Sequence, residues 1–93
     1  MSVKVMIHYP HLKELVNNQD TVEVQGRTIG QCLNDLVNQF PDIKTRIFDE
    51  QGTLLNFINI YQNKVSTYNA PDPLAKSVKD GDEIAIILMI AGG

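Results

Sequence analysis

The segment at residues 83–90 constrains the fold more than any other part of the chain, because it is apolar on both faces of an extended backbone. Successive side chains of a strand point to opposite faces, and the two rows here are Ile84, Ile86, Leu88 and Ile90 against Ala85, Ile87 and Met89. A strand that is apolar on both faces usually lies inside its sheet rather than at an edge. Residues 83–90 are therefore predicted to form the central strand of a sheet.

Two segments near the N-terminus have the alternation of strands with one buried face. Apolar side chains alternate over residues 2–8, up to Pro10, and again over residues 21–25, up to Gly26. The apolar positions are Val3, Val5 and Ile7 in the first segment and Val22 and Val24 in the second. We predict that the two segments pair as a hairpin with a long loop between them.

A helical period follows Gly26. The apolar residues that share one helical face are Ile29, Leu33, Leu36, Val37 and Phe40. Thr28 occupies the N-cap position, and Gln31, three residues later, completes a capping-box pattern. Pro41 is predicted to end this helix, because its ring cannot continue the ladder of backbone hydrogen bonds.

The remaining elements are shorter. In chain order we expect an irregular stretch at residues 42–53, a strand at 55–61, a turn at 63–64, a short returning strand from 65 and one helical turn at 74–78. Asp80-Gly81-Asp82 has the composition of a tight turn in which Gly81 takes a positive φ.

This order of elements predicts an α+β fold. One main helix packs across a mixed sheet, and the first and last strands are central and run parallel, joined through the elements between them. That architecture is the β-grasp fold of ubiquitin. No repeat or linker divides the sequence, so we expect residues 1–93 to form a single domain.

Composition excludes several classes of function. The 93 residues carry a formal net charge of −3 with a pI of 5.1, whereas a nucleic-acid binder needs a basic face. One cysteine cannot form an intramolecular disulfide or a four-cysteine zinc site. The longest apolar stretch, residues 84–91, is far shorter than the roughly 20 residues that span a bilayer, and the N-terminus does not resemble a signal peptide. We expect a cytoplasmic protein with no nucleic-acid, membrane or metal partner.

The chain closes on Ala91-Gly92-Gly93, directly after the predicted central strand. Glycine has no Cβ, so such a tail can carry its α-carboxylate through a narrow tunnel in another protein. The sequence here resembles the ThiS/MoaD family of ubiquitin-like sulfur carriers. The resemblance rests on Asp80-Gly81-Asp82-Glu83-Ile84, the terminal Ala91-Gly92-Gly93 and the helix start Thr28-Ile29-Gly30.

The resemblance implies a carrier rather than an enzyme. In this family an E1-like enzyme uses ATP to adenylate the terminal carboxylate, here that of Gly93, which then becomes a thiocarboxylate. A synthase partner accepts the sulfur, and the carrier itself binds no cofactor. The resemblance favours the cysteine and molybdopterin branches over the thiamine branch. The residues expected to contact partners along a flexible tail are Leu88, Met89, Ile90, Ala91 and Gly92.

Two other functions remain open from the sequence. The first is a ubiquitin-like modifier that forms isopeptide bonds to lysines, and the second is a β-grasp binding module whose terminal glycines are incidental. The roles of Leu88 and Met89 also have two interpretations, because the alternation of side chains along a strand directs one of the two away from the helix-covered face. Each is either a contact for a partner or a core residue.

Other side chains that could carry chemistry have simpler interpretations. Cys32 lies on the apolar helix face and is interpreted as a small core residue. His8 and His11 lack a third ligand in sequence and are interpreted as loop residues. Asp80 and Asp82 bracket a glycine and are interpreted, with Glu83, as turn residues.

Overall fold

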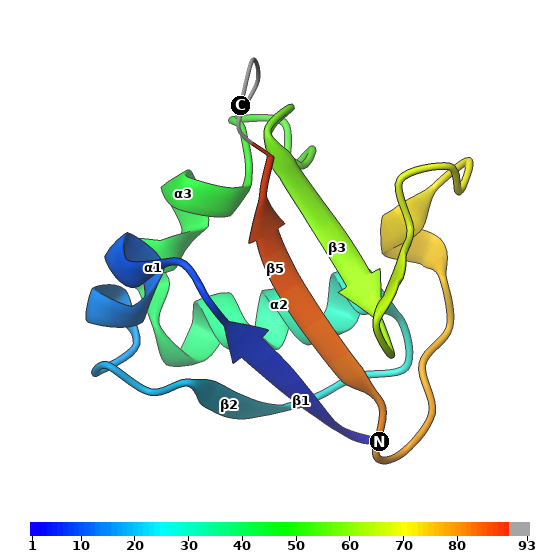
Figure 1. The fold of residues 1–93 in the computed structure, drawn as a ribbon, viewed down its shortest axis with the longest axis horizontal. Helices are drawn as coiled ribbons and strands as arrows, with labels where there is room; N and C mark the ends of the chain where they lie inside the picture. The colour runs from blue at the N-terminus through cyan, green and yellow to red at the C-terminus, as the bar shows by residue number, and fades with distance from the viewer. Residues whose placement is uncertain (90–93) are drawn as a thin grey trace.

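The computed structural model describes residues 1–89, which form a five-stranded mixed sheet with the strand order β2-β1-β5-β3-β4 (Figure 1). The strands are β1 (Ser2–Ile7), β2 (Thr21–Gln25), β3 (Ile58–Gln62), β4 (Val65–Ser66) and β5 (Glu83–Leu88). The helices are α1 (Pro10–Leu15), α2 (Ile29–Gln39) and α3 (Lys44–Ile47), with 3₁₀ turns η1 (Pro41–Ile43) and η2 (Pro73–Ala75).

The β5 strand lies in the middle of the sheet, as its two apolar faces predict. It runs parallel to β1, with Val5 opposite Ile84, and antiparallel to β3, with Ile60 opposite Ile86. The β-grasp prediction, with first and last strands inside the sheet and parallel, is confirmed. The strand is shorter than the predicted 83–90: β5 ends at Leu88, and Met89 lies just beyond it. Residue 90 and the predicted flexible Gly-Gly tail lie outside the described residues.

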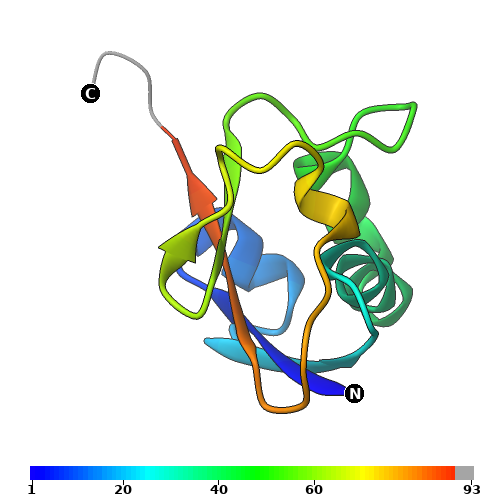
Figure 2. The same ribbon diagram turned by 90° about the vertical axis from the view of Figure 1, so that its right-hand side faces the viewer.

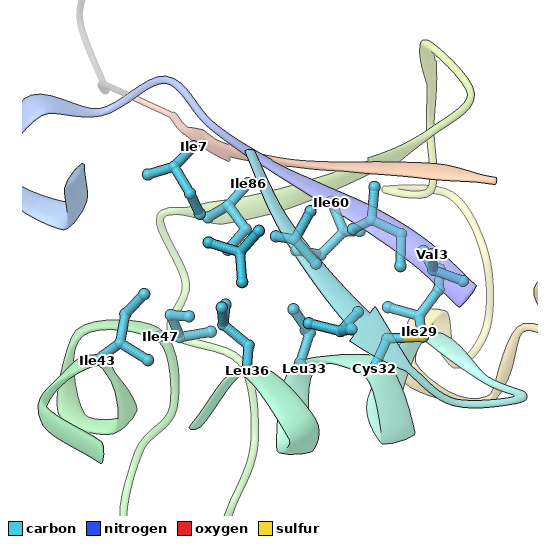
Figure 3. Packing of buried hydrophobic residues seen from close by; sticks show 14 of the residues in the cluster. Val3, Ile7, Ile29, Cys32, Leu33, Leu36, Ile43, Ile47, Ile60 and Ile86 are labelled. Atoms are coloured by element: carbon cyan, nitrogen blue, oxygen red, sulfur yellow. The ribbon is translucent and has the colours of Figure 1, made fainter. Parts of the chain in front are cut away.

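The core lies between the sheet and α2, which crosses one of its faces (Figures 2 and 3). Ile29, Cys32, Leu33 and Leu36 point from α2 toward the sheet and are fully buried. They meet the inward row of the strands, which includes Val3, Val5, Ile7, Ile60, Ile84 and Ile86. Val37 and Phe40, predicted on the same helical face, are only half-buried and pack against the margin of this cluster.

The start of α2 is held as its sequence predicts. The hydroxyl oxygen of Thr28 accepts a hydrogen bond from the backbone N–H of Gln31 at 3.1 Å. The side-chain oxygen of Gln31 accepts in return from the backbone N–H of Arg27 at 2.9 Å, one residue earlier than in a standard capping box. Gly30 lets η2 approach closely, because a Cβ there would lie 3.0 Å from the carbonyl oxygen of Leu74.

Two segments predicted as loops contain short helices. The long loop of the first hairpin holds α1, and the stretch at residues 42–53, predicted as irregular, holds the end of η1 and all of α3. Pro10 and Pro41 were interpreted only as ends of the preceding elements, but each also begins a helix. Proline suits the first helical position, because the missing N–H has no intrahelical acceptor there and its φ is already helical.

Strand β3 begins three residues later than predicted, because residues 55–57 form a turn. The backbone N–H of Leu55 donates to the carbonyl oxygen of Ile47 at 2.9 Å, and that of Ile58 donates to Leu55 at 3.0 Å. After β3, Asn63 and Lys64 both have positive φ, as the predicted turn requires.

The outer edge of β2 is covered by two side chains of α2. The carboxylate of Asp35 accepts from the backbone N–H of Gln25 at 2.9 Å, and the amide of Gln39 donates to the carbonyl oxygen of Glu23 at 3.0 Å. The same Gln39 amide donates to Asp35 at 3.2 Å. Open strand edges pair readily with other chains, and these contacts occupy backbone groups that such pairing would use.

Within residues 1–89, none of the helices has the length and apolar character needed to traverse a membrane.

Candidate functional site

The acidic turn before β5 has a structural role. Gly81 has a φ of +88°, and the carboxylate of Asp80 accepts from the backbone N–H of Ser2 at 2.8 Å. The carboxylate of Asp82 accepts from the backbone N–H of Lys79 at 2.8 Å and from the amide of Asn63 at 3.0 Å. These hydrogen bonds, with that from Lys79 the stronger cause, lower the pKa of Asp82. The turn interpretation is correct for Asp80 and Asp82, whereas Glu83 is the first residue of β5; the turn lies at the end of β5 remote from residue 89 (Figure 1).

Leu88 and Met89 lie at the other end of β5, where the chain leads toward residues 90–93. Both side chains are half-buried, and Leu88 packs against the edge of the core. The backbone N–H of Met89 donates to the carbonyl oxygen of Phe57 at 2.7 Å, which extends the β5–β3 pairing by one residue. The other predicted contact residues, Ile90, Ala91, Gly92 and Gly93, lie outside the described residues.

Leu88 and Met89 line the same hollow, which we call the tail-root groove and which has a volume of about 410 Å³. Its lining residues are Tyr9, Leu12, Thr45, Arg46, Leu55, Phe57, Leu88 and Met89. The Phe57 side chain is 47% exposed, although it is large and apolar. The described residue next to the tail, Met89, therefore lines a largely apolar hollow, which Arg46 also lines.

A second hollow, of about 410 Å³, is lined by the row of β5 side chains that points away from the core. We call it the sheet-face hollow, and its lining residues are Met6, His8, Tyr61, Lys64, Glu83, Ala85 and Ile87. Ala85 and Ile87 form the second apolar row of β5, and they are half-buried rather than covered by another layer. An apolar sheet face that stays open to solvent is typical of a protein contact surface.

Cys32 has the core role that the sequence predicts, whereas of the two histidines interpreted as loop residues only His8 lies in a loop, because His11 lies within α1. Cys32 is fully buried, and burial raises the pKa of its thiol, which therefore stays protonated. The ring of His11 packs edge-on against Tyr9, with the ring centroids 5.3 Å apart. Across residues 1–89, no three His, Cys, Asp or Glu side chains come together as a metal site would require.

Sequence analysis missed most of the tail-root groove. Tyr9 and Leu12 come from the start of α1, and Thr45 and Arg46 come from α3. Both helices lie in segments predicted as loops, so no pattern placed their side chains beside β5. The only signal was Phe57, an aromatic residue in a predicted strand.

A β-grasp domain whose central strand leads past two apolar hollows into a glycine-terminated tail defines a class, the ubiquitin-like carriers and modifiers. The sequence model of the ThiS family matches residues 9–93, and the chain belongs to that family. Proteins of this family act as carriers and not as catalysts, so the expectation of a non-enzyme is confirmed.

The chain is similar to curated sulfur carriers and to an archaeal modifier protein. It is 32% identical over 84 residues to the sulfur carrier protein CysO of Mycobacterium tuberculosis, covering 88% of this chain and 89% of that protein. It is 32% identical over 73 residues to small archaeal modifier protein 1 of Haloferax volcanii, covering 77% of this chain and 78% of that protein. Among solved structures, the Amycolatopsis orientalis BexX/CysO complex matches with a TM-score of 0.84 and 31% identity, covering 98% of this chain and 99% of the other.

Proposed function

We propose that this protein is a sulfur carrier whose Gly93 carboxylate is adenylated by an E1-like enzyme and converted to a thiocarboxylate. The observation that carries the proposal is the position of β5, a central strand held on both sides that leads directly toward the Ala91-Gly92-Gly93 tail. Membership of the ThiS family and 32% identity to CysO support the same chemistry. Dependence on ATP also favours a cytoplasmic location.

The proposed reaction begins at the Gly93 carboxylate. One carboxylate oxygen attacks the α-phosphorus of ATP, which forms an acyl-adenylate and releases pyrophosphate. A hydrosulfide then attacks the acyl carbon, so that a C–S bond forms, the C–O bond to AMP breaks and a thiocarboxylate remains. The thiocarboxylate sulfur then forms a bond to the acceptor, which gives a thioester between the carrier and the acceptor. Water attacks the acyl carbon of this thioester, so that the C–S bond to the carrier breaks, the sulfur stays on the acceptor as a thiol and the Gly93 carboxylate is restored. The carrier needs no cofactor of its own, because ATP is bound by the activating enzyme.

We infer that the acceptor is a synthase of the kind that makes cysteine, with the molybdopterin branch second. The identity to CysO, over 88% of this chain, supports this choice. The relative solved with BexX shows that a CysO protein forms a complex with a second protein. A synthase that encloses the tail of this chain would contact Leu88 and Met89.

The proposal is tested at the C-terminus with the E1-like enzyme and ATP. Deleting Gly93, or adding one residue after it, is expected to abolish adenylation, because the reacting group is the α-carboxylate itself and the length of the tail determines how far it reaches into the activating enzyme. Thermal melts of both variants should match that of the unaltered chain. An unchanged rate of ATP–pyrophosphate exchange in the deletion variant would refute the proposal.

A second candidate function is protein modification. The 32% identity to small archaeal modifier protein 1 favours it specifically, and the same acyl-adenylate could be captured by a lysine amine instead of a hydrosulfide. Covalent ladders on a denaturing gel that require ATP and the intact C-terminus would support this function. A sulfur-containing mass without ladders would support the carrier alone.

A further inference from the structure

The tail-root groove lies within a short distance of any enzyme that acts on Gly93. Four residues follow Met89, and even a fully extended chain of that length spans only about 14 Å. Leu88 and Met89 line the groove themselves, so the groove adjoins the part of the chain that an enzyme acting on the tail encloses. Its surface is therefore within reach of that enzyme.

The walls of the groove are already fixed by backbone hydrogen bonds. Met89 donates to Phe57 at 2.7 Å, and Leu55 donates to Ile47 at 2.9 Å, which joins α3 to the segment before β3. The loop between α3 and Leu55 is held by Asp49, whose carboxylate accepts hydrogen bonds from the backbone N–H groups of Gln51 and Thr53 at 2.9 Å each. A preformed surface loses little conformational entropy when it binds a partner.

The lining indicates the chemistry of the ligand. The half-exposed ring of Phe57, with Leu55 and Met89 beside it, offers contact to an apolar side chain. Among the described residues that line the groove, Arg46 is the one that carries a full charge. Guanidinium groups pair with carboxylates through two parallel hydrogen bonds, a geometry that makes arginine suited to ion pairs at interfaces, and Arg46 is exposed in the free carrier.

We propose that the tail-root groove receives an apolar side chain flanked by a carboxylate from the E1-like adenylating enzyme, with Phe57 and Arg46 as its two recognition residues. Phe57 buries the apolar group, and Arg46 pairs with the carboxylate beside it. The inference rests on the proposed function and adds two contacts outside the tail. It also gives the carrier a positive docking contact despite its net charge of −3.

The test measures ATP–pyrophosphate exchange with the E1-like enzyme at increasing carrier concentration. Phe57→Ala and Arg46→Glu are each expected to raise KM by about tenfold with kcat unchanged, as losses at buried anchor residues do. The Arg46→Glu effect should shrink at high salt, because the pair is screened. Arg27→Glu is the matched control, because Arg27 is an exposed arginine that precedes α2 and does not line the groove, so the variant should leave KM unchanged.

The outcomes separate this inference from the function on which it rests. If the unaltered chain is not adenylated, the proposed function fails. If the unaltered chain is adenylated and neither variant changes KM, the groove is not the docking site. If the variants weaken only transfer to the sulfur-accepting synthase, the groove serves that partner and the inference is wrong. Thermal melts of both variants establish that any rise in KM does not come from unfolding.

Discussion

Replacing Met89 with aspartate tests whether the base of the tail is a docking surface. Met89 follows β5 and is half-buried in the tail-root groove, so part of its side chain is already in contact with the protein. Its backbone hydrogen bond to Phe57 does not involve the side chain and is retained in the variant. The substitution therefore removes side-chain contacts and adds one charge, without breaking the strand pairing.

The expected magnitudes follow from this half-burial. Fully burying a methionine side chain contributes about 1.5–3 kcal/mol, so a partner that covers the exposed half gains about 0.7–1.5 kcal/mol. Desolvating the new carboxylate adds a cost of at least about 1 kcal/mol. Together these terms weaken binding by at least about 1.4 kcal/mol, which is tenfold in Kd. Loss of the contacts already made within the chain costs about 1 kcal/mol of folding stability, or about 4–8 °C in Tm.

The assay compares Kd for the E1-like enzyme with the Tm of the free carrier. Val65→Asp is the matched control, because Val65 is 67% exposed in β4, which pairs with the end of β3 remote from the tail. The control should bind normally. An unchanged Kd for Met89→Asp would remove Met89 from the docking surface, and a fall in Tm several times larger than expected would place it in the core.

Three further predictions concern the fold. Leu36→Ala should lower stability by about 2–5 kcal/mol in thermal melts, since Leu36 is fully buried, whereas Asn38→Ala on the exposed side of α2 should change little. Asp82→Asn should have a lower Tm than the unaltered chain at pH 7. Folding lowers the pKa of Asp82, so the stability that its carboxylate contributes is lost as the pH falls through that pKa, and the difference in Tm should disappear below about pH 4. A difference in Tm that stays constant with pH would contradict this reasoning. The double variant Asp35→Ala, Gln39→Ala should expose the backbone groups at the β2 edge and promote self-association, which light scattering would detect. A double variant that stays monomeric at high concentration would show that these two side chains are not needed to protect the edge.

Long, regular patterns made most of the fold predictable. The double apolar row of residues 83–90 placed β5 inside the sheet, and the helical period from Ile29 to Phe40 located α2, including its Thr28 cap. Both segments extend over enough residues for the period to stand out from neighbouring sequence. The acidic turn was predictable for a different reason, because Asp-Gly-Asp has few other local structures available to it.

Short helices and the surface between them were not predictable. The six residues of α1 and the four of α3 are too few to establish a helical period, and their prolines were interpreted as ends rather than beginnings. The tail-root groove depends on where those helices pack beside β5, which is a tertiary property that local patterns do not record. Leu88 and Met89 could be predicted from the sequence as residues at the start of the tail, whereas the position of Phe57 and Arg46 beside them could not.

The intact mass of the carrier tests the central claim most directly. The protein is incubated with the E1-like enzyme, ATP and hydrosulfide, and then measured beside a variant that lacks Gly93. The account predicts that the mass of the unaltered chain rises by the difference between a sulfur and an oxygen atom, and that the mass of the deletion variant does not change. An unaltered chain whose mass stays constant while ATP is consumed at its C-terminus would contradict the account.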